Sequence, residues 1–537
     1  LQSRVLSRSP NRDAEFWADR YRSARTEGRP LRVLIPTCRL STYIQYSSQG
    51  LVDAFVRAGH EAQVVIEPDA STMLSSASFL DACDRFDPDL IVLINFPRAT
   101  RPDSFPSDVP FVCWIQDHMP QIYDESVGLS QGTLDFTVGH TPPELYEQLR
   151  FPAAQSLSSP VVVNPADFYE GPVAPGDRAQ FECDLAYVSH QSETFDDLAA
   201  RLRSELASGA QGPRASSLAS VIDLLVPAVR SSVENLATAP ISPSLRLALW
   251  DAMDHAGLDR SDAGLEATLL HAAAWPLAER LVRHRTLDWA ADLADRDGLR
   301  LKIHGNGWDR HPRFARYAAG PLEHGEALRS SYAYAKIHLH PTTRAAVHQR
   351  VLECVLSGGF PLVSFYLDAT PIDTQLAGRF ELDPDAASGR TQAGDLVFHR
   401  ADYPELLRDA LWRQEIGLPV SATIEVDEAY LRARNAAPRP AGDMLSLPAA
   451  LFPSLRPFVF TDRDDFESRV RTLLDDVPDR RRWAGVLKRR VQSAYTLDGL
   501  VGRLIPFIEG RLDAAATRSK PTKVNQDEDR TGDEAAA

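Results

Sequence analysis

Apolar and polar positions alternate in two separate stretches of the chain, and each stretch predicts a parallel α/β domain. In the first stretch, helical segments separate apolar runs such as LRVLIPT, EAQVVIE, DLIVLINF and DVPFVCWIQD. One of these helices is expected from Ser47 to Ala58, and SPVVVNPADFY is expected as a further strand. In the second, FECDLAYVSH and LRLKIHGNGW begin the same rhythm again. Because crossovers between parallel strands are right-handed, the pattern predicts an α/β fold with two doubly wound, Rossmann-like domains.

The segments around these domains have other patterns. EGPVAPGDRAQ is rich in Pro and Gly and is typical of a linker, so a domain boundary is expected near residue 175. Residues 210–297 show only helical periodicity and predict an inserted helical subdomain, either a structural elaboration or dimer surface or a platform for a large acceptor. The expected organisation is an N-terminal helical extension at 1–30, a first domain at 31–175, a second domain at 176–209 and 298–457, two C-terminal helices within 458–513 and a disordered tail at 514–537.

Residues 335–364 predict one strand–helix–strand unit. An alternating strand pattern is followed by a helix-compatible run from about Ala345 to Leu356, a Ser357-Gly358-Gly359 stop and an apolar strand from Phe360 to Phe365. On the helix, Gln349, Arg350 and Glu353 lie opposite the apolar arc. The loop 340–347 lies at the carboxyl end of a parallel strand, where α/β sheets bind ligands. The polar face is therefore expected to line a ligand cleft, unless Arg350 and Glu353 simply form a surface ion pair.

Composition narrows the class of protein. The 537 residues carry a net charge of −16, which disfavours an extended nucleic-acid partner because such binding needs a basic footprint. The five cysteines are widely spaced and form no CxxC pair, so neither a disulfide framework nor a zinc site is expected. The chain shows no run of about 18 apolar residues and no secretory signal. These features predict a cytoplasmic protein with no transmembrane segment.

Three segments carry a family resemblance: IHGNGW, GPLEHGEALRSSYAYAKIHLHPTTRAAVHQRVLECVLSGGFPLVSF and FTDRDDFESRVRTLL. They resemble GT-B type glycosyltransferases, and more specifically the spore maturation protein B-like glycosyltransferase family, over roughly residues 299–367 and 457–507. The resemblance implies a nucleotide-sugar donor held by the second domain, an acceptor held by the first and chemistry in the cleft between them. It also implies that catalysis needs no metal and no cofactor besides the donor, which acts as a co-substrate.

Several residues of the second domain are candidates for donor binding. The resemblance implies that Glu353 bonds the donor ribose, whereas the second acid common in related enzymes is replaced by Ala345, which argues against their retaining mechanism. Gly305, Asn306 and Gly307 could approach the nucleotide closely, or could form a plain turn.

Trp308 follows that turn and could stack on a base or fill the core. His348, Gln349 and Arg350 lie near a helix start, which favours a diphosphate, although His348 could equally be a core histidine.

The ends of other strands supply further candidates. Ser189 and His190 end the first strand of the second domain and could reach the donor phosphates. In the first domain, Asp117 and His118 follow the apolar run FVCWI and could act as the general base of an inverting transfer, or as a helix cap beside an exposed histidine. His140 is a weaker candidate, and the loop PTCRLSTYIQYSSQG lacks GxGxxG but holds Arg39, Ser41, Thr42 and Tyr43 where a ligand could sit.

The predicted function is transfer of a sugar from a nucleoside-diphosphate sugar, UDP-linked rather than GDP-linked, to an acceptor hydroxyl on a protein, glycan or small molecule. One alternative is a nucleotide-sugar epimerase or hydrolase on the same fold. Another is a catalytically silent scaffold that acts through its interactions, with a homodimer as one form it could take.

Overall fold

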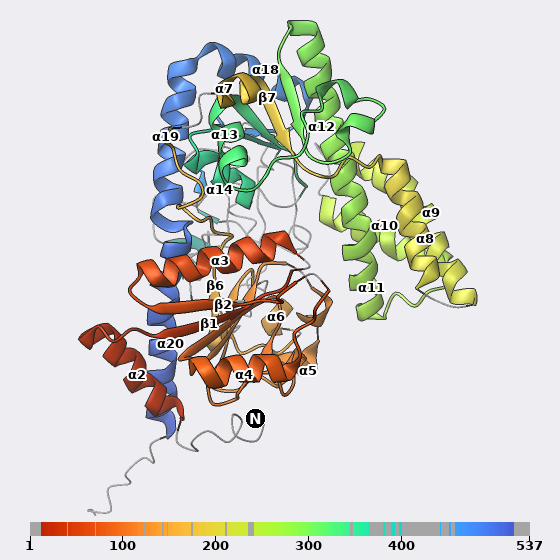
Figure 1. Ribbon diagram of the computed structural model, residues 1–537. Coiled ribbons are helices and arrows are strands. Elements are labelled where there is room, and N and C mark those ends of the chain that lie inside the picture. Colours follow the sequence, from red (N-terminus) through yellow and green to blue (C-terminus); the bar gives the residue numbers. More distant parts are fainter. Residues whose placement is uncertain are drawn as a thin grey trace, which may run out of the picture.

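The computed structural model (Figure 1) places two parallel sheets in two α/β domains, with a group of helices beside them. The residues that the structure describes are 12–39, 41–69, 71–117, 119–122, 124–141, 144–147, 149–172, 176–209, 212–234, 241–343, 347–364, 380–381, 388–391, 397–399, 441, 451–452 and 457–519.

The first domain is built on a six-stranded parallel sheet of order β2-β1-β3-β4-β5-β6. Its strands are β1 (Arg32–Pro36), β2 (Glu61–Val65), β3 (Leu90–Ile94), β4 (Phe111–Ile115), β5 (Asp135–Gly139) and β6 (Ser156–Ser158). Its helices are α2 (Ala14–Glu27), α3 (Thr42–Arg57), α4 (Ser76–Phe86), α5 (Glu125–Leu129) and α6 (Glu144–Glu147), with short 3₁₀ turns at Arg98–Thr100, Pro120–Ile122 and Ala153–Gln155. Every residue of β4 is buried, as expected for a central parallel strand.

The second domain is built on a five-stranded parallel sheet of order β14-β10-β9-β7-β8. Its strands are β7 (Cys183–Val188), β8 (Leu301–His304), β9 (Ala335–His340), β10 (Pro361–Ser364) and β14 (Val459–Phe460). Its helices are α7 (Asp177–Phe181), α13 (Glu326–Tyr334), α14 (Gln349–Leu356), α18 (Arg463–Asp475) and α19 (Val477–Ala494), with 3₁₀ turns at Trp308–Arg310 and Ala315–Tyr317. Two doubly wound parallel domains confirm the predicted fold class.

A small antiparallel sheet follows β10 in the sequence. It pairs β11 (Phe380–Glu381), β12 (Ser388–Thr391) and β13 (Val397–His399) in that order.

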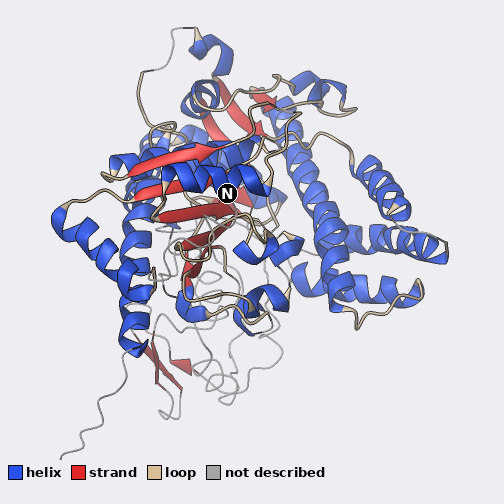
Figure 2. Ribbon diagram, turned by 60° about the horizontal axis from the view of Figure 1, so that its bottom comes forward, coloured by secondary structure: helices blue, strands red, loops and turns tan. Residues whose placement is uncertain are grey.

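The helical subdomain contains α8 (Phe195–Ser208), α9 (Pro213–Glu234), α10 (Ile241–His255), α11 (Ala263–Leu269), a π-helical turn (Leu270–Ala274) and α12 (Trp275–Asp297). Figure 2 shows this group standing to one side of the two sheets. Its core is separate from those of the α/β domains and includes the apolar face of α8, which was expected to belong to the second domain.

Among the described helices, α9 has the length and composition to span a bilayer. Its apolar residues Leu218, Val221, Ile222, Leu225, Val229 and Val233 are buried in the core of the helical subdomain, which is the packing of a core helix.

The C-terminal helices differ from the prediction in number and in extent. Helix α19 ends at Ala494, and Tyr495 and Thr496 separate it from a third helix, α20 (Leu497–Ser519). Its apolar residues, from Leu497 to Leu512, enter the core of the first domain, and α20 runs beside α2 and α3 (Figure 1). Residues 514–519, expected in the disordered tail, continue this helix, with Ala515 only 9% exposed.

Two helix starts and one strand also differ from the prediction. Helix α3 begins at Thr42 and not at Ser47, because Ser41 caps it through a hydrogen bond from Ile44 N (3.4 Å). Helix α14 begins at Gln349 with His348 as its N-cap, not near Ala345, which lies outside the described residues. The strand expected at SPVVVNPADFY is absent from the described chain there: β6 ends at Ser158, and Pro160 and Pro165 deprive the segment of ladder donors.

Candidate functional site

The topology of each sheet defines one edge at which a ligand is expected. In the first sheet the strand order reverses between β1 and β3, and in the second between β7 and β9. In open parallel sheets, ligands bind outside the carboxyl ends of the strands at this switch point. We call the carboxyl ends of β1, β3 and β4 the first-sheet edge, and those of β7, β8 and β9, with the start of α14, the second-sheet edge.

At the second-sheet edge, the turns after β7 and β8 lie against each other. His190 Nδ1 accepts a hydrogen bond from Asn306 N at 3.0 Å, and Trp308 Nε1 donates to Ser189 O at 2.6 Å. His190 and Asn306 are exposed, whereas Ser189 is buried. The structure therefore brings together the predicted residues Ser189, His190 and Asn306.

The two glycines of this turn are explained by packing within the protein. Gly305 has a φ of 142°, and a Cβ there would lie 1.9 Å from Ser189 O. Gly307 has a φ of 78°, and a Cβ there would lie 2.5 Å from Ser192 Oγ. The plain-turn alternative thus accounts for both positions, although their place at the edge keeps the turn close to any ligand bound there.

Trp308 belongs to the core of the second domain, which corrects its prediction as a donor contact. Its ring has no exposed surface and packs at 5.6 to 6.0 Å, centroid to centroid, from four rings: Tyr187, His284, His311 and Phe314. A base could stack on this indole only after the core had been repacked.

His348 sits at the start of α14 as its cap. Its Nδ1 accepts a hydrogen bond from Arg350 N at 3.2 Å, and its ring lies 4.5 Å from that of His340. Desolvation lowers the pKa of His348 to about 3, with further lowering by the charges of Arg350 and Arg283. The imidazole is therefore neutral at physiological pH, and its Nε2 carries the proton because Nδ1 is an acceptor.

Glu353 is a buried carboxylate with two side-chain donors, not half of a surface ion pair. It is 4% exposed, and it accepts hydrogen bonds from Tyr332 Oη (3.1 Å) and Gln349 Nε2 (2.9 Å). Desolvation raises the pKa of Glu353, against the lowering by the Gln349 hydrogen bond, the Arg350 charge and the Tyr332 hydrogen bond. A buried carboxylate whose pKa burial perturbs is typical of functional sites.

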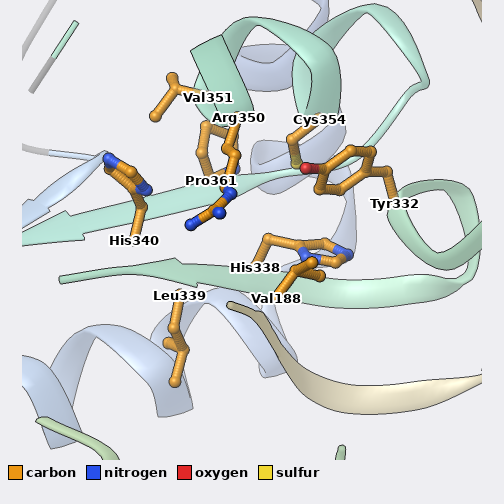
Figure 3. Close-up of a pocket in the computed structure, with 9 residues that line it drawn as sticks. All are labelled: Val188, Tyr332, His338, Leu339, His340, Arg350, Val351, Cys354 and Pro361. Carbon is orange, nitrogen blue, oxygen red and sulfur yellow. The ribbon is translucent and has the colours of Figure 1, made fainter. Parts of the chain in front are cut away.

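Arg350 points inward from α14. Figure 3 shows its guanidinium in a small pocket between α14 and strands β7 and β9, flanked by His338, His340 and Tyr332. Burial lowers the pKa of His338 to about 4, so this neighbour is neutral. Arg350 forms no ion pair with any residue in the described part of the chain.

At the first-sheet edge, Asp117 is exposed and is held by Asn95. Asn95 Nδ2 donates to Asp117 Oδ2 at 3.1 Å, and Asn95 Oδ1 accepts from the backbone amides of Gln116 (2.7 Å) and Asp117 (3.1 Å). The predicted partner of Asp117, His118, lies outside the described residues. The structure thus supports a positioned carboxylate here and says nothing about the imidazole.

The two domains meet at α3. Tyr46 stacks on His324 of the second domain, with ring centroids 3.8 Å apart and planes 11° apart. Tyr43, one turn earlier, is 37% exposed by area, yet the surrounding protein desolvates its phenol. Its pKa is raised mainly by that desolvation, and also by the charges of Asp117 from the first domain and Glu353 from the second. Asp117 and Glu353 therefore act on one phenol from opposite domains.

The weaker candidates have local roles. Arg39 is tied to Glu67, whose carboxylate accepts from Arg39 N at 2.8 Å and whose carbonyl accepts from Arg39 Nε at 2.6 Å. His140 is exposed after β5. Ser357 Oγ donates to Glu353 O at 2.7 Å and Gly358 has a φ of 87°, as in a helix C-cap.

Comparison with known proteins gives fold similarity only. No family model matches the chain, and a search of curated proteins finds no match. Sucrose-phosphate synthase from Thermosynechococcus elongatus is 11% identical, with 91% of this chain and 100% of that chain covered at a TM-score of 0.40. The spinosyn forosaminyltransferase SpnP is 11% identical over 89% of this chain and 99% of that chain at 0.34, and the glycosyltransferase SnogD from Streptomyces nogalater is 11% identical over 89% and 100% at 0.33.

With TM-scores below 0.5, these similarities carry no argument about chemistry. The resemblance to the spore maturation protein B-like family stays a prediction.

Three residues at the two edges were not predicted from the sequence. Asn95 stands directly after the apolar run of β3, a polar residue at a strand end, and this signal could have identified it. Tyr332 reaches Glu353 from α13, and His324 reaches Tyr46 from the preceding loop. Both are tertiary contacts that no local pattern reveals.

Proposed function

We propose that the protein is a glycosyltransferase that moves a sugar from a nucleoside-diphosphate sugar, UDP-linked, to an acceptor hydroxyl on a protein, glycan or small molecule. The observation that carries this proposal is the contact of the two domains at the start of α3, where Tyr46 stacks on His324 and the charges of Asp117 and Glu353 both raise the pKa of Tyr43. A positioned carboxylate, Asp117, comes from one domain, and a buried carboxylate beside an arginine, Glu353 beside Arg350, comes from the other. Two chemically different groups from two domains would offer one side of the site to each of two substrates.

In this proposal the second-sheet edge holds the donor. Arg350 forms no ion pair with any of the described residues, although its charge lowers the pKa of the nearby Glu353, and a half-buried cation gains from a directly bonded anionic partner, which the diphosphate supplies. The family resemblance gives Glu353 the ribose hydroxyls. The positive end of α14 adds to the attraction, although His348 already occupies one of its free amides.

The first-sheet edge supplies the base. Asp117 accepts the proton of the acceptor hydroxyl while the hydroxyl oxygen forms a bond to the anomeric carbon of the sugar. The bond from that carbon to the phosphate oxygen breaks at the same time, and the nucleoside diphosphate leaves with the electron pair, its charge offset by Arg350. A single displacement of this kind inverts the anomeric centre.

The proposal includes no metal and no cofactor besides the donor, no nucleic-acid partner and a cytoplasmic location. Metal independence is tested by measuring transfer with and without excess EDTA, which leaves the rate unchanged if it holds.

The test of the function uses the full chain. Titration with UDP, GDP and TDP is expected to give binding by UDP, with slowed hydrogen exchange at residues 347–353. A screen of nucleotide sugars is then expected to show donor hydrolysis, and transfer once an acceptor is present. No binding at millimolar nucleotide would refute the proposal. Release of an altered free sugar without transfer would favour an epimerase or hydrolase, and a bound but unreactive donor would favour a silent scaffold.

A further inference from the structure

Helix α12 joins two cores. Its first half, with Leu277, Ala278 and Val282, is buried in the helical subdomain, and its second half, with Leu287 and Ala290, is buried in the second domain. One continuous helix of 23 residues therefore belongs to both units. A displacement of the helical subdomain must move this helix within the second domain, because packed cores transmit strain.

The first half of α12 holds the start of the loop that follows β9. Glu279 Oε1 accepts three hydrogen bonds from that loop: from Thr342 Oγ1 (3.1 Å), Thr343 N (3.0 Å) and Thr343 Oγ1 (2.9 Å). The Glu279 side chain is only 17% exposed. Charge-assisted hydrogen bonds of this kind are about twice as strong as neutral ones. Thr342 and Thr343, which follow β9, are thus anchored on the helical subdomain.

The same stretch of α12 holds the loop that follows β7. His284 Nε2 lies 3.0 Å from Gln191 O, and Arg280 donates to Glu193 O while its guanidinium lies 3.5 Å from the Glu193 carboxylate. The loops after β7 and β9 flank the switch point of the second sheet. Both of them are therefore fixed by one helix that enters from outside the sheet.

Arg283 completes this contact. Its Nε lies 3.2 Å from Glu279 Oε2, in a pair whose side chains are 11% and 17% exposed. Its charge also contributes to the lowered pKa of His348, so it lies near the start of α14. Glu279 thus uses one oxygen for the loop and the other for Arg283.

We propose that Glu279 is a positioning residue of the donor site, through which the helical subdomain sets the conformation of Thr342 and Thr343 after β9. This inference rests on the proposed function for the identity of the ligand, a nucleoside diphosphate. It makes the helical subdomain part of the site, where the sequence left open a structural elaboration, a dimer surface or an acceptor platform.

The test compares three variants of the full chain. Glu279→Ala removes the anchor, and Glu279→Gln keeps an oxygen at the Oε1 position while it loses the charge that pairs with Arg283. Glu266→Ala is the matched control, because Glu266 lies in the same subdomain, is also 17% exposed and pairs with Arg246 at 3.0 Å, but contacts neither loop.

Two readouts separate this inference from the proposed function. Without ligand, hydrogen exchange at the Thr343 amide and the first turn of α14 is expected to accelerate at least tenfold in Glu279→Ala, while Glu266→Ala leaves it unchanged. With ligand, UDP affinity is expected to fall about tenfold in Glu279→Ala, with KM for the donor rising more than kcat falls, and Glu279→Gln is expected to recover most of the affinity.

Equal exchange at Thr343 in Glu279→Ala and Glu266→Ala would overturn the positioning role, whatever the ligand. Accelerated exchange in a protein that binds no nucleoside diphosphate would instead overturn the proposed function and the donor-site role of Glu279, leaving only a loop anchor. Accelerated exchange with unchanged UDP affinity would overturn the donor-site role alone.

Discussion

The side-chain amide of Asn95 holds the carboxylate of Asp117, with 3.1 Å between Asn95 Nδ2 and Asp117 Oδ2. Asn95 is 1% exposed and has a φ of 62°, a left-handed conformation that Asn tolerates better than most residues. Its Oδ1 meanwhile accepts from two successive amides of the turn after β4. Asn95 therefore fixes both the backbone and the side chain of Asp117.

Replacement of Asp117 by Asn is expected to lower kcat by roughly 10²-fold or more, because a general base contributes about 10² to 10⁴ to such a step. UDP affinity should stay within twofold of the wild type, since Asp117 lies in the first domain. Initial rates and calorimetric titration measure the two quantities. Asp53→Asn, on α3 of the same domain with Gln49 as its partner, is the control. Full activity in Asp117→Asn would exclude this residue as the base.

Asn95→Ala is expected to lower kcat by about tenfold, less than the loss in Asp117→Asn, because the carboxylate remains but is no longer oriented. The double variant should be little slower than Asp117→Asn alone, since both residues act through one carboxylate. Asn95→Gly separates the backbone from the side chain, because glycine adopts the positive φ freely. If Asn95→Gly turns over at the wild-type rate, the side-chain hydrogen bond has no role in turnover.

Glu353→Gln is expected to weaken UDP binding about tenfold while it stabilises the fold at pH 7. Burial raises the pKa of Glu353 above its ordinary value near 4.5, so the folded protein holds this proton more tightly than the unfolded chain. The protonated form of Glu353 makes its full contribution to the free energy of unfolding below pH 4.5. This contribution is lost as the pH rises through the raised pKa of Glu353 in the folded state. We expect Tm at pH 7 to rise by about 1 to 3 °C in the variant, and the gain to vanish near pH 4.5. A lower Tm at both pH values would contradict this account.

The fold is expected to weaken in mild acid because three buried histidines of the second domain and the helical subdomain resist protonation. Burial lowers the pKa of His284, His304 and His338 to about 4 each. The neutral histidines make their full contribution to stability above pH 6.5, the ordinary pKa of histidine. The contribution is lost as the pH falls toward 4, since the unfolded chain then binds more protons than the folded protein.

Thermal unfolding between pH 7.5 and pH 4.5 measures this effect. His304→Leu should reduce the pH dependence of the free energy of unfolding by up to about 1.4 kcal/mol per pH unit. His255→Leu, at a side chain 64% exposed on α10, should not change it. If the free energy of unfolding depends equally on pH in the two variants, burial of His304 is not the cause of the weaker fold in acid.

The strands were predictable because central parallel strands are continuous apolar runs. The run FVCWI is buried along its whole length in β4, and the strand–helix–strand unit from Ala335 to Ser364 is present as β9, α14 and β10. The helix starts were harder to predict. Ser41 begins α3 within a polar stretch, and His348 caps α14 although histidine is not among the usual cap residues.

The candidate site was only partly predictable, because its chemistry depends on distant contacts. Polarity at the carboxyl ends of strands predicts Asp117, Ser189 and His190 as candidates, and the structure places each of them at such an end. The same signal could not separate Trp308 as a core residue from a base-stacking one. Nor could it show that Glu279, more than 60 residues before Thr343 in sequence, holds the loop after β9. Those relationships exist only once the helical subdomain is packed.

The return of α20 to the first domain has a consequence for the order of folding. Leu500, Leu504, Ile508 and Leu512 fill the same core as β1, β3 and β4, although more than 350 residues separate them in sequence from the last of these strands. During synthesis, the first domain emerges from the ribosome with that face open to solvent, and it stays open until α20 has been translated. Nascent chains that stall before residue 497 should therefore expose apolar surface and recruit chaperones, whereas chains that include α20 cover it.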